Sequence, residues 1–174
     1  MTYGYVCSGK GSPMKTLTLS AVLLSSAVVS FASGARAESL FVEGDIVRGA
    51  QKGAPGPACV LNNQFKHLEK VVWRFRVRDQ NGKVLDEKSL KSLVVELPDG
   101  QKISAAYGPH GPANAPVDHF WTAIWVIPAN YPNGAFTYKA LATGGDGGSA
   151  TWEPFLSKPS QLQVMPGEIE IKNP

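Results

Sequence analysis

The sequence has very little cysteine and lacks the short motifs that mark common catalytic and metal centres. Its 174 residues include two cysteines, and no C-x-x-C, H-E-x-x-H or G-x-S-x-G pattern occurs. The first absence excludes c-type haem attachment, and the third removes one signature of a serine nucleophile. After residue 37, no apolar run approaches the 20 or so residues that a transmembrane helix needs.

The N-terminal 37 residues have the layout of a cleaved secretory signal peptide. A lysine follows Met14, and an apolar stretch over Leu17–Phe31 is succeeded by small residues ending in an A-x-A site at Ala37. These are the three parts of such a leader, and the apolar part is too short to span a bilayer. We expect residues 1–13 to be an upstream extension, cleavage after Ala37, and export to the periplasm or the medium without a membrane anchor.

Removal of the leader leaves a chain without net charge. Three of the 17 basic residues and none of the 14 acidic residues lie within residues 1–37, so the remainder carries 14 of each sign. The isoelectric point of about 8.9 therefore reflects the leader. This charge balance gives no support to a nucleic-acid partner or to a polybasic membrane contact.

Short strand-like segments between closely spaced turn residues predict one all-β domain over residues 38–174. Val72–Arg78 alternates apolar and arginine side chains, which is typical of a strand with one buried face. A return strand over Gln101–Tyr107 is expected after the Pro98-Asp99-Gly100 turn. His119–Ile127 is largely apolar on both faces and predicts a central strand buried on both sides. The absence of an amphipathic helix favours an antiparallel β-sandwich.

A turn followed by an aromatic strand occurs near the C-terminus, in Tyr131-Pro132-Asn133-Gly134-Ala135-Phe136-Thr137-Tyr138-Lys139-Ala140. A Pro-x-Gly turn leads here into an aromatic-x-Tyr strand, and a Gly-Asp-Gly tip follows. This segment resembles the penultimate strand of immunoglobulin-like (Ig-like) domains of exported bacterial proteins. The antibody-type Cys–Trp–Cys arrangement is missing, because Cys59 has no cysteine partner after the leader is removed. The resemblance implies an Ig-like fold and no specific activity.

The Pro/Gly-rich segment 108–118, with the aromatic residues beside it, is the predicted binding site. The candidate ligand- or partner-binding residues are Tyr107, His110, His119 and Trp121. Loops held on a rigid β-scaffold commonly carry function. The leading hypothesis is an exported, non-enzymatic binding or accessory module that presents this loop to a protein or a small ligand and needs no cofactor.

Two alternatives stay open, and both use Cys59. A thiolate combined with imidazoles is a ligand set for copper, and Cys59, His110 and His119 would supply it in a periplasmic copper-handling protein. A thiol-dependent enzyme would need an electropositive neighbour that favours the thiolate. Against both, Cys59 opens an apolar stretch, which favours its burial as a small core side chain.

Three arginines, Arg74, Arg76 and Arg78, share the polar face of the predicted strand. Guanidinium groups in a row could clamp a carboxylate, sulfate or phosphate. Pairing with acidic residues of other strands, such as Glu96, is the favoured alternative, because charged outer faces are usual in antiparallel sheets. The adjacent Asp118 and His119 should point to opposite faces of a strand, which argues against a base with its orienting acid.

Overall fold

The computed structural model describes residues 39–53, 56–111 and 117–169, which all belong to one unit, Ala35–Pro174. This part of the chain is built of β-strands, with one turn of 3-10 helix, η1, at Lys158–Ser160. No helix in the described ranges is long and apolar enough to cross a membrane. The prediction of an all-β chain is confirmed for these residues. The predicted leader and its cleavage site after Ala37 lie outside them.

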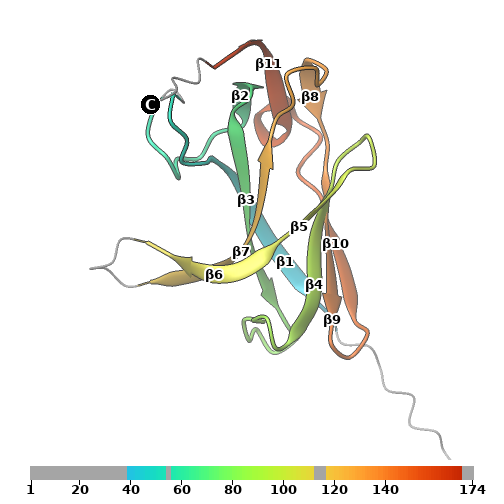
Figure 1. The fold of residues 1–174 in the computed structure, drawn as a ribbon. Coiled ribbons are helices and arrows are strands. Elements are labelled where there is room, and N and C mark those ends of the chain that lie inside the picture. The colour runs from blue at the N-terminus through green and yellow to red at the C-terminus, as the bar shows by residue number, and fades with distance from the viewer. Residues whose placement is uncertain (1–38, 54–55, 112–116, 170–174) are drawn as a thin grey trace, which may run out of the picture. The chain divides into compact units, whose positions relative to one another are not determined.

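Eleven strands in the described residues form three sheets (Figure 1). The first sheet has the order β1-β3-β7-β6, the second β10-β9-β4-β5, and the smaller third sheet β2-β11-β8. Neighbouring strands are antiparallel except β2 and β11, which are parallel. The strands are β1 Phe41–Arg48, β2 Gln64–His67, β3 Lys70–Arg78, β4 Leu90–Glu96, β5 Lys102–Ser104, β6 Ala106–His110, β7 Asp118–Val126, β8 Gly134–Phe136, β9 Lys139–Gly144, β10 Ser149–Trp152 and β11 Leu162–Glu168.

The main core is formed jointly by the first and second sheets. Trp73, Phe75 and Val77 of β3 are almost completely buried and belong to the same apolar cluster as Leu93 and Val95 of β4. Period-two alternation puts the β3 side chains on one face, so the predicted half-exposed strand is confirmed. Each large apolar side chain buried in this way contributes about 1.5–3 kcal/mol to stability.

Strand β7 is buried on one face only, so the prediction of burial on both faces is wrong. Trp121 and Trp125 point into the core, whereas Ile124 and Val126 on the other face are 55% and 44% exposed. An apolar composition cannot distinguish a covered face from an open one, because that depends on which layers the fold places nearby.

The predicted return strand over Gln101–Tyr107 is in fact two strands in two sheets. β5 pairs with β4, and after Ala105 the chain crosses to the first sheet and pairs as β6 with β7. The turn before it is confirmed, since the Leu97 N–H donates to the Gln101 carbonyl at 2.9 Å and Gly100 has φ 82°. The crossing brings Tyr107 next to β7 instead of β4.

The two ends of the predicted loop 108–118 belong to strands. β6 continues to His110, which pairs with Asp118 at the start of β7. Residues 111–117 connect the two strands, and 112–116 lie outside the described residues. Pro109 is tolerated because β6 is an edge strand, where its missing N–H breaks no ladder. In Figure 1 the β6–β7 hairpin extends away from the other strands.

Candidate functional site

The four residues predicted to bind a ligand lie on the β6–β7 hairpin but not on one face of it. Tyr107 lies between His119 and Trp121, with ring centroids 5.7 Å and 5.4 Å away. His110 lies on the opposite face, where its Nε2 is 2.6 Å from Thr122 Oγ1. The hairpin therefore brings together three of the four residues and separates His110 from them.

Trp121 is a core residue. It is 5% exposed, and its indole N–H donates to the Leu85 carbonyl at 2.9 Å. A buried tryptophan with a satisfied N–H gains little from a ligand. The surface that remains on this face of the hairpin is the exposed His119 ring stacked on the half-buried Tyr107 ring.

The structure does not bring Cys59, His110 and His119 together as a ligand set. The two histidines occupy opposite faces of the hairpin, as the pairs His110↔Asp118 and Pro109↔His119 require. Cys59 lies on another edge of the same sheet, where its N–H donates to the Arg48 carbonyl at 2.8 Å. Within the described residues, no group of three or more His, Cys, Asp or Glu side chains could hold a metal ion.

Cys59 is exposed, which corrects the expectation of a buried core thiol. Its φ of 61° lies in a region that residues other than glycine seldom adopt. The Cys59 N–H and the Arg48 N–H bond to Arg48 O and Val60 O, so the chain bends here and runs along the edge of β1. Local backbone geometry, and not apolar sequence context, thus decides the position of the thiol.

The arginine face of β3 is neutralised by acids from neighbouring strands, in the pairs Arg74–Asp45, Arg76–Asp118 at 3.7 Å and Arg78–Glu43 at 3.9 Å. Two parallel hydrogen bonds join Arg74 to Asp45, and they hold the pKa of Arg74 above its usual value. Glu96 pairs with Lys102 of the second sheet instead. Cross-strand pairing, the favoured alternative, is confirmed with different partners.

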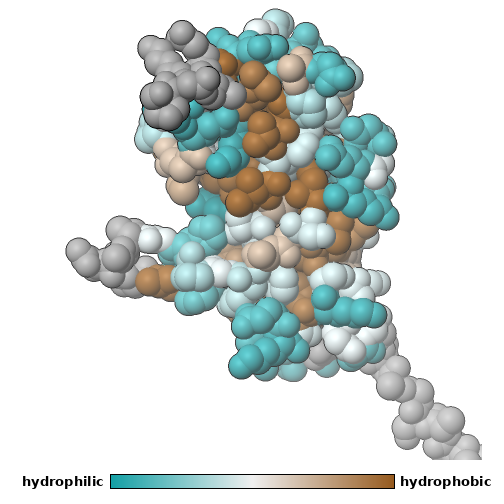
Figure 2. Space-filling view, viewed as in Figure 1, coloured by the Kyte–Doolittle hydropathy of each residue, from teal (hydrophilic) through white to brown (hydrophobic). Residues whose placement is uncertain are grey.

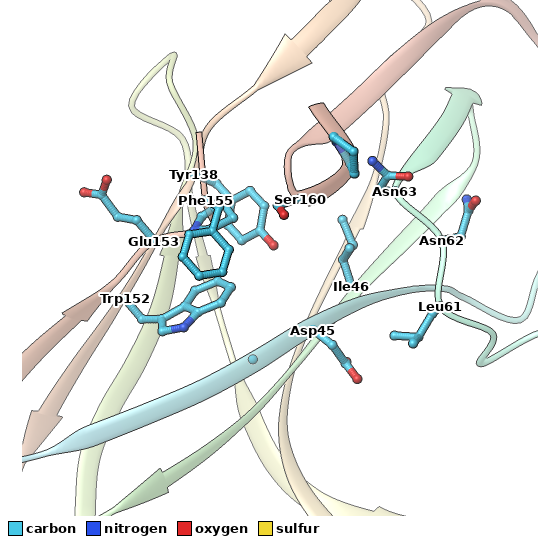
Figure 3. Close-up of a pocket in the computed structure, with 13 residues that line it drawn as sticks. Asp45, Ile46, Leu61, Asn62, Asn63, Tyr138, Trp152, Glu153, Phe155 and Ser160 are labelled. Atoms are coloured by element: carbon cyan, nitrogen blue, oxygen red, sulfur yellow. The ribbon is translucent and has the colours of Figure 1, made fainter. Parts of the chain in front are cut away.

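A pocket of about 440 Å³ opens between the edge strands β1 and β10, and we call it the edge cleft. Its lining comes from β1, from the segment before β2, from Tyr138 just before β9, and from the end of β10 through η1. Figure 3 shows two facing walls. One wall is aromatic, with Tyr138, Trp152 and Phe155, and the other carries Leu61, Asn62 and Asn63.

The aromatic wall is anchored in the core. The Trp152 ring meets the Phe75 ring edge-on at 5.8 Å and the Tyr138 ring at 6.1 Å, between centroids. Figure 3 shows the Tyr138 hydroxyl pointing into the cleft. Burial raises the pKa of Tyr138, so this hydroxyl stays protonated near neutral pH. Because Tyr138 is only 2% exposed, it supports the half-buried Trp152 ring and offers little surface of its own.

The opposite wall presents amide groups in fixed orientations. Asn63 Nδ2 donates to the carbonyls of Lys158 and Gln161 at 2.9 Å and 3.1 Å, and Asn62 Nδ2 donates to the Gln64 carbonyl. The two Asn63 bonds join the segment before β2 to the segment around η1.

The carboxylates at the margin of the cleft are already paired. Asp45 pairs with Arg74, and Glu153 lies 3.1 Å from Lys139 Nζ. The interior of the cleft therefore offers apolar surface and neutral hydrogen-bonding groups. This combination suits an apolar or amphipathic ligand without net charge.

The most exposed large apolar side chains lie around this cleft. Apolar residues reach the surface at several places (Figure 2), and the largest exposed fractions are those of Phe155, Leu156 and Leu61, at 83%, 81% and 67%. Such exposure is typical of interaction surfaces. The sequence signal for this surface is the Pro-Phe-Leu run that follows a strand ending in tryptophan.

The function of the cleft has to be inferred from its own geometry, because no protein-family model matches the chain and no curated protein matches it.

Proposed function

We propose that this protein is an exported binding module, a single Ig-like β-sandwich over residues 38–174, and that its ligand binds in the edge cleft. One observation carries the proposal. The cleft places an anchored aromatic wall opposite an oriented amide wall, beside largely exposed apolar side chains. Pockets that bind ligands combine apolar lining with a few placed polar groups.

Two further observations support the Ig-like fold and the exported location. The first two sheets are antiparallel and share one core, as expected of an Ig-like sandwich. The sequence over residues 131–140 resembles a strand of that family, although the structure divides this segment between β8 and β9. The leader-like residues 1–37 support export to the periplasm or the medium.

The proposed site differs from the one expected from the sequence. On the hairpin, Trp121 is buried and His110 faces away from Tyr107 and His119. In the cleft, apolar and polar groups converge on one space of about 440 Å³. The binding function expected from the sequence is kept, and its location moves to the opposite edge of the first sheet.

A nuclear magnetic resonance titration of the purified, ¹⁵N-labelled protein tests this proposal. A panel of neutral aromatic, aliphatic and saccharide fragments should shift the indole N–H of Trp152 and the side-chain amides of Asn62 and Asn63. The buried indole N–H of Trp121 serves as an internal reference that should not move.

A matched pair of variants locates the site independently. Phe155→Ser should weaken fragment binding about tenfold, the effect of losing about 1.4 kcal/mol of contact. Ile124→Ser removes another exposed apolar side chain, on the outer face of β7, and should leave binding unchanged. Shifts that concentrate on Tyr107 and His119 would instead place the site on the hairpin.

A further inference from the structure

We infer that the edge cleft receives an extended segment of a partner protein, which pairs with β1 as an added strand and inserts one large apolar side chain between the cleft walls. The inference rests on the proposed function and specifies its ligand as a polypeptide. Three features carry it: the edge of β1, the position of the cleft beside that edge, and the charges on β1.

The free edge of β1 is already occupied along its C-terminal half. Residues 59–62 run beside it, with the Arg48 N–H bonded to the Val60 carbonyl at 3.1 Å and the Asn62 N–H bonded to the Ile46 carbonyl at 3.2 Å. Ile46 and Arg48 thus direct their backbone groups away from β3. This edge accepts strand-like pairing within the chain itself.

The N-terminal half of the same edge is open. Backbone groups alternate in direction along a strand, so Val42 and Gly44 must face the same way as Ile46 and Arg48. In the described residues, β1 pairs along Val42–Gly44 with β3 on its other side and with no strand on this one. An open strand edge is a template for pairing with another chain.

Other edges of the two large sheets are protected in ways that this one is not. β6 carries Pro109, which lacks a donor, β5 has three residues and carries Lys102, and β10 has only four residues. Short edge strands, prolines and lysines are common means of preventing strand addition. The open stretch of β1 contains neither proline nor lysine.

The edge cleft begins where the open edge ends. Gly44 lines the cleft together with Trp152 and Phe155. A Cβ on Gly44 would lie 2.4 Å from the Phe75 ring, so this ring closes directly against the backbone of β1 and supports Trp152 from behind. The inward side chain of a strand added opposite Gly44 would meet the aromatic wall. Main-chain pairing with a pocket for an alternate side chain is an established mode of peptide recognition.

The charges on β1 favour a partner over a second copy of this chain. Phe41, Glu43 and Asp45 share the outer face of the strand, and the Glu43 side chain is 63% exposed with Arg78 no closer than 3.9 Å. Two copies of β1 paired in antiparallel fashion would bring these acids opposite one another, and such like-charge pairs are destabilising. The fitting partner segment has a large apolar residue inward and neutral or basic residues outward.

A designed peptide provides the probe. It has seven residues with capped ends, a central phenylalanine, flanking threonines and a lysine at each end. The peptide lacks tryptophan. Of the four tryptophans in the chain, Trp152 is half buried and the other three are buried. A saturable blue shift of the protein's tryptophan emission therefore reports occupation of the cleft. The same peptide with a central aspartate should bind at least tenfold more weakly.

N-methylation of the peptide tests strand pairing without any change to the protein. Methyl groups on the alternate amides that would face β1 should weaken binding about tenfold or more, because they remove main-chain hydrogen bonds. Methyl groups on the other amides, which would face solvent, should have little effect.

A pair of protein variants tests the same edge. Val42→Pro removes a backbone N–H donor from the open edge and should weaken peptide binding about tenfold or more, whereas Val42→Thr keeps this donor and should not. The thermal unfolding of both variants verifies that they fold.

The outcomes separate this inference from the proposed function. Equal binding of both methylated peptides would show that the cleft takes an apolar group without strand pairing, which overturns the inference and leaves the proposed function standing. Failure of every peptide, with fragments still shifting Trp152, would do the same. Failure of peptides and fragments together would overturn both. A dimer in sedimentation experiments that Val42→Pro dissociates would identify a second copy as the occupant and overturn the choice of partner.

Discussion

The β6–β7 hairpin and the edge cleft both gather aromatic residues, but they use them in opposite ways. On the hairpin, Trp121 is buried with its N–H satisfied, and Tyr107 packs against it. At the cleft, Trp152 is only half buried and Phe155 is 83% exposed. The difference is that the fold leaves the rings accessible and places polar groups opposite them at the cleft, whereas the hairpin buries its largest ring.

The largest expected effect is on stability and concerns the hairpin. Trp121→Ala should lower the free energy of unfolding by about 3–5 kcal/mol, because it leaves a cavity and an unpaired carbonyl at Leu85. Phe155→Ser should change it by less than about 0.5 kcal/mol, as expected of an exposed residue. Urea denaturation measures both. A small effect of Trp121→Ala would mean that the Trp121 ring is not part of the core. The hairpin and the cleft would then not differ in the burial of their aromatic rings.

A moderate effect is expected on the outer face of the hairpin. His110→Ala removes the contact of 2.6 Å with Thr122 Oγ1 and should cost about 1 kcal/mol. Combining it with Thr122→Val should give a cost smaller than the sum of the two single changes, since both remove one hydrogen bond. Binding of the peptide probe to the cleft should be unaffected. Weaker peptide binding in His110→Ala would join the two regions into one site.

The smallest effect on stability is expected at Cys59. Cys59→Ser should leave the free energy of unfolding within about 0.5 kcal/mol of its original value, and iodoacetamide should alkylate the thiol fully in the folded protein, because the residue is exposed. Added Cu(I) should not slow this reaction through His110 and His119, which lie on opposite faces of another strand pair. Protection by copper would restore the metal alternative.

Local pattern predicted those elements whose two faces differ in chemistry. The alternation of arginines with Trp73, Phe75 and Val77 identified β3 and its buried face correctly, and the Pro-Asp-Gly turn before β5 was located correctly. His119–Ile127 was identified as a strand, but its exposed face was not. In such a strand both faces are apolar, so the sequence pattern does not distinguish them. Which face is buried then depends on the layers packed nearby.

The four predicted site residues do not share one face, for a related reason. Gly108 and Pro109 suggested a loop, yet both lie in the edge strand β6, where one side of the backbone needs no partner. No single short motif predicts the whole edge cleft, since its lining comes from separate segments around residues 45, 62, 138 and 155. Their proximity arises from sheet order, which no short motif encodes.

The sequence by itself determined the all-β class, the charge balance and the alternation of β3, because side-chain period and turn chemistry act over a few residues. The tertiary structure decided which apolar faces stay open, that Cys59 is exposed, that His110 and His119 point apart, and that an aromatic wall faces an amide wall beside an unpaired edge. These features depend on the pairing of strands that are distant in sequence. The free energy that selects such pairing comes from burial in a shared core, to which residues along the whole chain contribute.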